Sequence, residues 1–199
     1  KQPAMDKPLY LGIDLGTTGV KAGLFDTEGQ ARRIASREMA LDNPAPGFAE
    51  FDAERYIGLV FDAIRELTAT PEAAVGVVRG IGLSSQAQTF VVLGEDGRPL
   101  RPAISWLDVR AAAEAAEFGE ASRKAIGTGT DAIASGPKLL WLRRREPAAM
   151  ARAKHVLLLP DYLIFRLTGR RVSDVRTAES TGCYDRKAGR WVDSLLDLC

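Results

Sequence analysis

Residues 11–26 read LGIDLGTTGVKAGLFD, in which two apolar runs flank a turn rich in glycine and threonine. From Leu9 to Leu15 the apolar side chains alternate with others, which is the period-two pattern of a strand with one buried face. The turn Gly16–Gly19 follows, and residues 20–25 predict a second strand. Asp14 falls near the end of the first strand, on the face opposite its apolar neighbours. The stretch therefore predicts a β-hairpin with a carboxylate beside its turn.

This turn has the residue types of a phosphate site. Gly16 lets the main chain approach a ligand closely, and convergent backbone N–H groups in such a turn bind anions. Thr17 and Thr18 add hydroxyl groups, and Lys21 adds a positive charge from the second strand. Asp14 can hold Mg²⁺ through water, because this ion keeps much of its hydration shell. The alternative is a plain hairpin whose turn merely favours glycine and threonine.

We favour the phosphate site because the whole string lies between two strands. Its parts together would clamp a transferring phosphoryl group. It is not the GxxxxGK[ST] loop, which needs a helix after the turn. The predicted roles are catalytic for Asp14 and Lys21, phosphate-binding for Gly16, Thr17 and Thr18, and magnesium-binding, through water, for Asp14.

Outside the hairpin, the apolar spacing predicts further strands and helices in an α/β layer pattern. The expected strands are residues 30–41, 77–84, 89–93 and 102–106, and the expected helices are 53–67, 109–118, 136–145, 160–168 and 193–199. We expect one domain in two subregions, rich in strands to about residue 106 and rich in helices after it. Residues 1–8 lack periodicity and are expected to be a flexible leader or a tag remnant.

Composition excludes several function classes. The 199 residues include 27 Lys and Arg against 26 Asp and Glu, so the formal net charge is +1. A near-neutral chain has no broad electrostatic surface for nucleic acid or anionic lipid. No apolar run approaches the roughly 20 residues of a membrane span. For these reasons we expect neither nucleic-acid nor membrane partners. The two cysteines form no CxxC pair and fit a reducing compartment, so we expect a cytoplasmic protein.

Three stretches of the sequence resemble the FGGY carbohydrate kinases. Residues 11–26 resemble the family's N-terminal phosphate motif, which actin and Hsp70 share more loosely. Residues 80–110, GIGLSSQAQTFVVLGEDGRPLRPAISWLDVR, match its S-x-Q strand end, D-G hairpin and P-L-x-P-A-I-x-W-x-D-x-R pattern. The middle region is similar in GPKLLWL, LPDYL and LTG, at residues 136–142, 159–163 and 167–169. The resemblance runs from about Leu9 to the end of the chain.

The resemblance implies an actin-like (ribonuclease H-like) domain, α/β in class, with a mixed sheet flanked by helices. Family members transfer the γ-phosphoryl group of ATP to a sugar hydroxyl with Mg²⁺. Residues 9–199 would be the N-terminal sugar-binding domain, incomplete and without the C-terminal nucleotide domain. The family's catalytic base, an aspartate, is expected beyond Cys199. We therefore expect the 199-residue segment by itself to have little or no turnover.

The resemblance also implies a set of sugar-binding residues: Gln86, Ala87, Gln88, Trp106, Asp108 and Arg110. Amide and carboxylate groups would bind the hydroxyls of a sugar, and an aromatic wall would cover its C–H face. Simpler explanations exist for five of these six residues. The glutamines can be ordinary loop polarity, Trp106 can be core packing, and Asp108 with Arg110 can be a structural pair at a helix start.

Departures from the motifs of family members narrow the range of candidate sugar substrates. Glycerol kinases typically carry Q-R-E-T where this chain has Gln86–Thr89, so the missing Arg and Glu disfavour glycerol. Xylulokinases typically carry Q-M-H-G there, yet residues 136–141 and 161–163 are closer to theirs. We expect a ketose such as xylulose or another pentulose, and a homodimer stays open. Two other functions stay open as well: a non-enzymatic sugar-sensing or binding module, and an actin- or Hsp70-like ATPase, against which residues 80–110 argue.

Overall fold

The computed structural model describes residues 8–69 and 78–199. Among them, residues 8–40, 54–69 and 78–85 form one compact unit, here unit 1, and residues 41–53 and 86–199 form a second, unit 2. In the described residues, the part up to Ile104 contains seven strands and one helix, and the part after it contains six helices and three short strands, as expected. The two compact units, however, do not divide the chain at residue 106. The expected leader lies outside the described residues except for Pro8.

Unit 1 is built on a four-stranded mixed sheet of order β3-β2-β1-β5. The strands are β1 (Leu9–Leu15), β2 (Gly19–Phe25), β3 (Ala31–Glu38) and β5 (Val78–Ser85). β1 and β2 pair antiparallel, as do β2 and β3, whereas β1 and β5 pair parallel. The predicted hairpin is therefore confirmed, and the crossover between β3 and β5 contains a helix.

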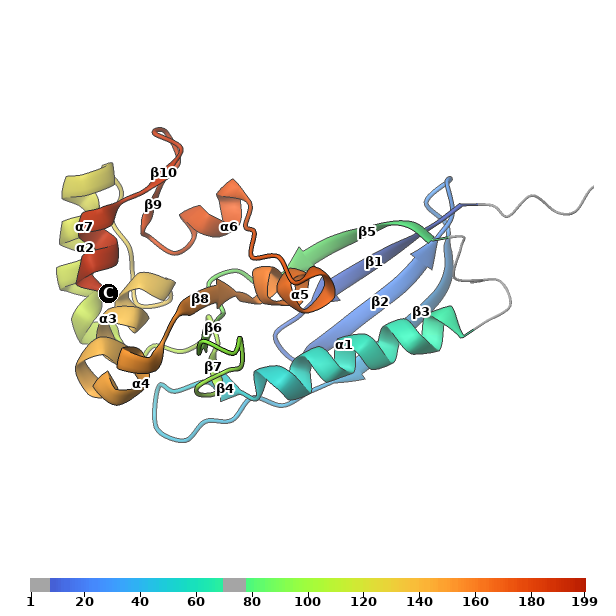
Figure 1. Cartoon of the computed structure of the whole chain (residues 1–199), viewed down its shortest axis with the longest axis horizontal. Helices are drawn as coiled ribbons and strands as arrows, with labels where there is room; N and C mark the ends of the chain where they lie inside the picture. The colour runs from blue at the N-terminus through green and yellow to red at the C-terminus, as the bar shows by residue number, and fades with distance from the viewer. Residues whose placement is uncertain (1–7, 70–77) are drawn as a thin grey trace, which may run out of the picture. The chain divides into compact units, whose positions relative to one another are not determined.

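That helix, α1 (Ala53–Thr68), runs along the sheet of unit 1 (Figure 1). Its apolar stripe is fully buried: Tyr56, Ile57, Val60, Ala63 and Leu67 are at most 1% exposed. From β1 the side chains of Leu11, Ile13 and Leu15 are at most 3% exposed. Because side chains alternate along a strand, burying this face of β1 leaves Asp14 exposed on the other.

Unit 2 contains a second four-stranded sheet, of order β4-β7-β6-β8, in which all pairs are antiparallel. Its strands are β4 (Glu50–Phe51), β7 (Ala103–Ile104), β6 (Phe90–Leu93) and β8 (His155–Leu158). The helices are α2 (Ala112–Ile126), α3 (Ser135–Arg145), α4 (Pro147–Arg152), α5 (Leu159–Thr168), α6 (Val175–Glu179) and α7 (Asp193–Leu198). A small hairpin joins β9 (Tyr184–Asp185) to β10 (Arg190–Trp191).

The helices at 136–145 and 160–168 are confirmed, and Gly169 ends α5 in the left-handed conformation with φ of 73°. The helix expected at 109–118 begins later, at Ala112, and continues to Ile126. Gly119 lies inside it, where a Cβ would meet the carbonyl of Thr130 at 2.8 Å. The sequence did not predict β8, α4, α6 or the β9–β10 hairpin. Within the residues that the structure describes, none of the helices combines the length and apolar character that crossing a bilayer demands.

Candidate functional site

The turn between β1 and β2 has a fixed backbone. The Gly16 N–H donates to the Gly19 carbonyl at 2.9 Å, and the Met39 N–H donates to the Thr18 carbonyl at 2.9 Å. A side chain cannot be added at Gly19, since its Cβ would lie 2.1 Å from the Arg37 carbonyl oxygen. The glycine is therefore required by the close approach of β3.

Tyr56 of α1 supports this turn from the interior of unit 1. Its hydroxyl donates to the Gly16 carbonyl at 2.7 Å, with the Gly19 carbonyl at 3.3 Å. Carbonyl oxygens repel anions, so directing them toward a buried hydroxyl suits a turn that receives phosphate. The sequence predicted the turn but not this support, because Tyr56 looks like one more member of an apolar helix stripe.

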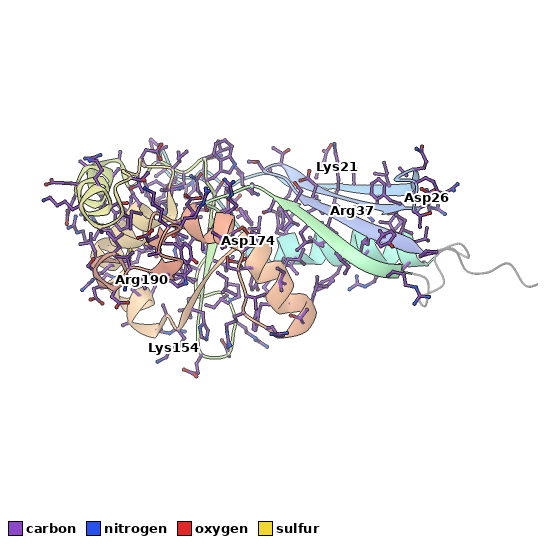
Figure 2. The ribbon with its side chains drawn as sticks, turned by 90° about the horizontal axis from the view of Figure 1, so that it is seen from above. Lys21, Asp26, Arg37, Lys154, Asp174 and Arg190 are labelled. Carbon is purple, nitrogen blue, oxygen red and sulfur yellow. The ribbon has the colours of Figure 1, made fainter. Side chains whose placement is uncertain are left out.

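Asp14 and Lys21 are brought together as the phosphate hypothesis requires. They are cross-strand partners in the antiparallel β1–β2 ladder and are both exposed, so their side chains share one face of the sheet. Ser36 of β3 and Ser84 of β5 extend the same row on either side. Figure 2 shows Lys21 on the sheet of unit 1, with Asp26 at the end of β2. The result is a polar row beside the turn.

One acidic residue, Asp14, lies in this polar row, and a single carboxylate fits a magnesium ion that is shared with a ligand. Among the described residues, no cluster of three or more His, Cys, Asp or Glu side chains could hold a metal. Mg²⁺ commonly takes only one or two carboxylates and completes its shell with water and substrate phosphates. Asp14, exposed beside the turn, suits that arrangement.

In unit 2, the predicted sugar loop 86–88 has a strained backbone. Gln88 has φ of 64°, and no other non-glycine residue in the described part of the chain has a positive φ. The left-handed region costs an ordinary residue about 1–2 kcal/mol, and such strain is often found at ligand sites. The Ser135 hydroxyl donates to the Gln88 carbonyl at 3.0 Å, and the Thr89 hydroxyl donates to the Gln86 side-chain oxygen at 2.8 Å.

Gln88 lines a cavity of about 280 Å³ within unit 2. Of the six predicted sugar-binding residues it is the only one that does. Its neighbours around the cavity are mainly polar and include Ser122, Thr128, Thr130, Asp131 and Glu179. These lining residues were not predicted from the sequence, although the polar run Gly127–Asp131 between two expected helices indicates a loop.

Trp106 is half-buried, and hydrogen bonds hold its backbone on both sides. Its N–H donates to the Thr89 hydroxyl at 3.0 Å. Lys138 of α3 donates to the Ser105 carbonyl at 2.9 Å, with the Trp106 carbonyl at 3.3 Å. Trp106 and the 86–88 loop are thus linked through Thr89.

Asp108 and Arg110 form a buried ion pair, with side chains 0% and 1% exposed. The Asp108 carboxylate accepts from the Ala49 N–H at 2.6 Å and from Arg110 at 2.7 Å. Arg110 also bonds Glu50 and lies over the Phe48 ring at 3.8 Å. Burial lowers the pKa of Arg110, but the hydrogen bonds and charges of Asp108 and Glu50 raise it by more. This geometry favours the structural pair over direct contact with a sugar.

Comparison with known proteins shows the family of this chain. Residues 9–199 match the model of the FGGY family of carbohydrate kinases, N-terminal domain. A xylulose kinase from Klebsiella pneumoniae is 34% identical over 194 residues, and a glycerol kinase from Thermococcus gammatolerans is 31% identical over 197. The alignments cover 96% and 94% of this chain, and 40% of each relative.

The solved structures agree as well. A "xyloylose kinase" from Brucella ovis superposes with a TM-score of 0.90 at 38% identity, over 95% of this chain and 40% of that one. The α/β, actin-like fold inferred from the resemblance is thereby confirmed. The chain spans about two fifths of the length of these relatives. It belongs to the FGGY family of carbohydrate kinases, to the part that forms their N-terminal domain.

Proposed function

We propose that this chain supplies the phosphate turn and the sugar-binding residues of a kinase that phosphorylates a ketose with ATP. Xylulose or another pentulose is the proposed substrate, since relatives at 34% and 38% identity are named for that sugar. One observation carries the proposal: Asp14 and Lys21 are paired on an exposed face beside a turn whose carbonyls are directed inward.

The proposed chemistry is in-line phosphoryl transfer, which depends on positioning and on charge neutralisation. Asp14 would organise Mg²⁺ through water, and the ion would neutralise charge on the phosphate oxygens. Lys21 would bind the transferring phosphoryl group, and Thr17 and Thr18 with the Gly16 backbone would orient its oxygens. The catalytic base is proposed to lie outside these 199 residues, which would leave the segment with little or no turnover of its own.

Unit 2 would bind the sugar. Gln88 lines a polar cavity, and a glutamine side-chain amide can both donate to and accept from sugar hydroxyls. Trp106 would cover an apolar face of the sugar, and Gln86 and Ala87 would complete the loop. Asp108 and Arg110 would contribute by fixing the segment that carries Trp106.

The proposed setting is the cytoplasm, with ATP and Mg²⁺ as cofactors and a small sugar as the partner, and without nucleic acid or membrane. Support comes from the balanced charge of 27 basic against 26 acidic residues and from Cys183 and Cys199, which are free thiols. A homodimer is compatible with the proposal.

A coupled ADP-release assay and calorimetry test the proposal. D-xylulose, D-ribulose and glycerol are offered to the 199-residue chain and, if its gene encodes a longer protein, to that protein. We expect a ketose to bind more tightly than glycerol, and ketose-dependent ADP release by the longer protein.

The active-site assignment is tested with Asp14→Asn, which should lower kcat by roughly 100-fold or more while the sugar Kd changes little. The matched control is Asp62→Asn on the exposed face of α1, which should leave both unchanged. Absence of ketose binding would refute the proposal. Binding without turnover by the longer protein would favour the sensing module, and ADP release stimulated by unfolded peptide would favour the chaperone-like ATPase.

A further inference from the structure

The first turn of α3 is polar and yet completely buried. Ser135 is 1% exposed and Lys138 is 0% exposed. Burying a hydroxyl or an ammonium group is costly unless hydrogen bonds replace its water. Burial lowers the pKa of Lys138 to about 8, which reflects that cost. Side chains kept here at such a cost need a reason beyond packing.

Both side chains donate to the backbone of the candidate sugar-binding segments. Ser135 donates to the Gln88 carbonyl, and Lys138 donates to the carbonyls of Ser105 and Trp106. The two residues are three apart, so they lie on one face of the helix. One helix face therefore contacts both the loop that carries Gln88 and the segment that carries Trp106.

Gln88 needs such a contact because its conformation is unfavourable. A non-glycine residue at φ of 64° persists when its surroundings hold it there. The bond from Ser135 fixes the Gln88 carbonyl, and therefore the orientation of the peptide, at a residue that lines the 280 Å³ cavity. Without this bond the loop could relax to a conformation in which the amide points elsewhere.

Trp106 is placed in the same way. Lys138 lies beneath its carbonyl, and Thr89 accepts from its N–H, so the backbone is held from two sides. Thr89 is itself connected to Gln86, so a shift of one segment would be passed to the other. The α3 turn anchors this connected pair of segments.

We infer that Ser135 and Lys138 are positioning residues for sugar binding: they act on the sugar through Gln88 and Trp106. The inference rests on the proposed function. If the two residues had a purely structural role, the same bonds would stabilise the fold but would not affect the affinity for the sugar.

Variants Ser135→Ala and Lys138→Met test the inference by calorimetry with D-xylulose and by kinase kinetics. Losing one neutral hydrogen bond should raise the sugar Kd about fivefold for Ser135→Ala, and losing a charged donor should raise it roughly tenfold or more for Lys138→Met. KM for the sugar should rise by more than kcat falls. Ser194→Ala and Lys124→Met, at exposed positions, are the matched controls and should stay within about twofold of the wild type, below the loss expected for one bond.

A double-mutant cycle separates positioning from stability. If Lys138 acts through Trp106, then Lys138→Met should change the sugar Kd little once Trp106→Ala is present. Additive losses in Kd would overturn the inference. If Lys138→Met does not fold, the cycle of Ser135→Ala with Gln88→Ala gives the same decision.

Different experimental results would contradict the proposed function and the inference about Ser135 and Lys138. A wild-type protein that binds no ketose removes the proposed function. A wild type that binds, with Ser135→Ala and Lys138→Met matching their controls, removes only the inference. Melting temperatures recorded for every variant show which losses of affinity accompany loss of fold.

Discussion

At the start of α5, the Asp161 carboxyl group is 5% exposed and borders a largely apolar cavity of about 550 Å³. Burial raises the pKa of Asp161 to about 6, although hydrogen bonds from Ser173 and the Leu158 backbone oppose the rise. Asp161 follows the N-cap Leu158 in the first turn of α5, where acidic residues are common in proteins. Its low exposure depends on residues far along the chain, so a local pattern could not reveal it.

The raised pKa predicts how stability depends on pH. The folded state disfavours the ionised carboxylate, so this group stabilises most below its unfolded pKa near 4, and that stabilisation is lost as pH rises to about 6. Asp161→Asn should therefore raise the free energy of unfolding at pH 7 by roughly 1–3 kcal/mol relative to wild type. Urea denaturation at pH 4.5 and pH 7 measures this.

The expected signature is a gain from Asp161→Asn that is larger at pH 7 than at pH 4.5. Asp197→Asn, at an exposed position, is the control: it should keep the pH dependence of the wild type, with a small effect on the free energy of unfolding at both pH values. An equal effect of Asp161→Asn at both pH values would contradict the assignment of a raised pKa.

Among the helices and strands, the sequence predicted those whose structure depends on residues close together in the chain. The β1–β2 hairpin follows from alternation and a glycine turn, and its register alone pairs Asp14 with Lys21. By contrast, β8 has four residues and is recognisable as a strand only through its pairing with β6, more than sixty positions earlier. The same holds for the candidate site: the residue types were visible, but the left-handed Gln88 and its bond from Ser135 required the fold.

The contact between α1 and the phosphate turn gives a prediction at this scale. Tyr56→Phe removes the hydroxyl that bonds the Gly16 and Gly19 carbonyls and keeps the buried ring. Stability should fall by about 1 kcal/mol, since the Gly16 carbonyl loses the bond from the Tyr56 hydroxyl, whereas the Gly19 carbonyl keeps the bond from the Gly16 N–H. If the turn receives phosphate, KM for ATP should rise or kcat should fall, while the sugar Kd stays constant.

Thermal unfolding and kinase kinetics check this. Tyr162→Phe, in α5 of unit 2, removes a hydroxyl that accepts from Arg166; it is the matched hydroxyl deletion and should leave nucleotide kinetics unchanged. Unaltered kinetics in Tyr56→Phe together with lost stability would make Tyr56 a purely structural residue.

At the scale of the whole molecule, unit 2 joins distant parts of the chain through a buried charge network. Glu50 of β4 accepts from Arg101 and from Arg110, each at 2.5 Å, and Arg101 also pairs with Glu146 after α3. Residues 41–53 are thereby tied to two segments that follow them by fifty residues or more. The composition gives only a near-neutral net charge and says nothing of where the charges lie, so it could not predict this buried network.

Removing the carboxylate of Glu50, which binds both arginines, should strongly destabilise the fold. Glu50→Gln leaves two largely buried arginines with too few carboxylates, and breaking such pairs typically costs about 3–5 kcal/mol. Urea denaturation should show this loss. Glu66→Gln, which breaks the more exposed pair with Arg37, should cost about 1 kcal/mol or less. Similar small effects at both positions would show that the Glu50 network contributes little.

The parallel pairing of β1 with β5 has a consequence for synthesis on the ribosome. Leu9 pairs with Val78, so one edge of β1 lacks its neighbour until β5 has been translated. Hairpin β1–β2 can form early, but β4, made before β5, finds its partner β7 only after residue 104. The order of translation therefore lets unit 1 complete its sheet first. The short segment 41–53 is translated before β5 but can pair only when the rest of unit 2 has been made.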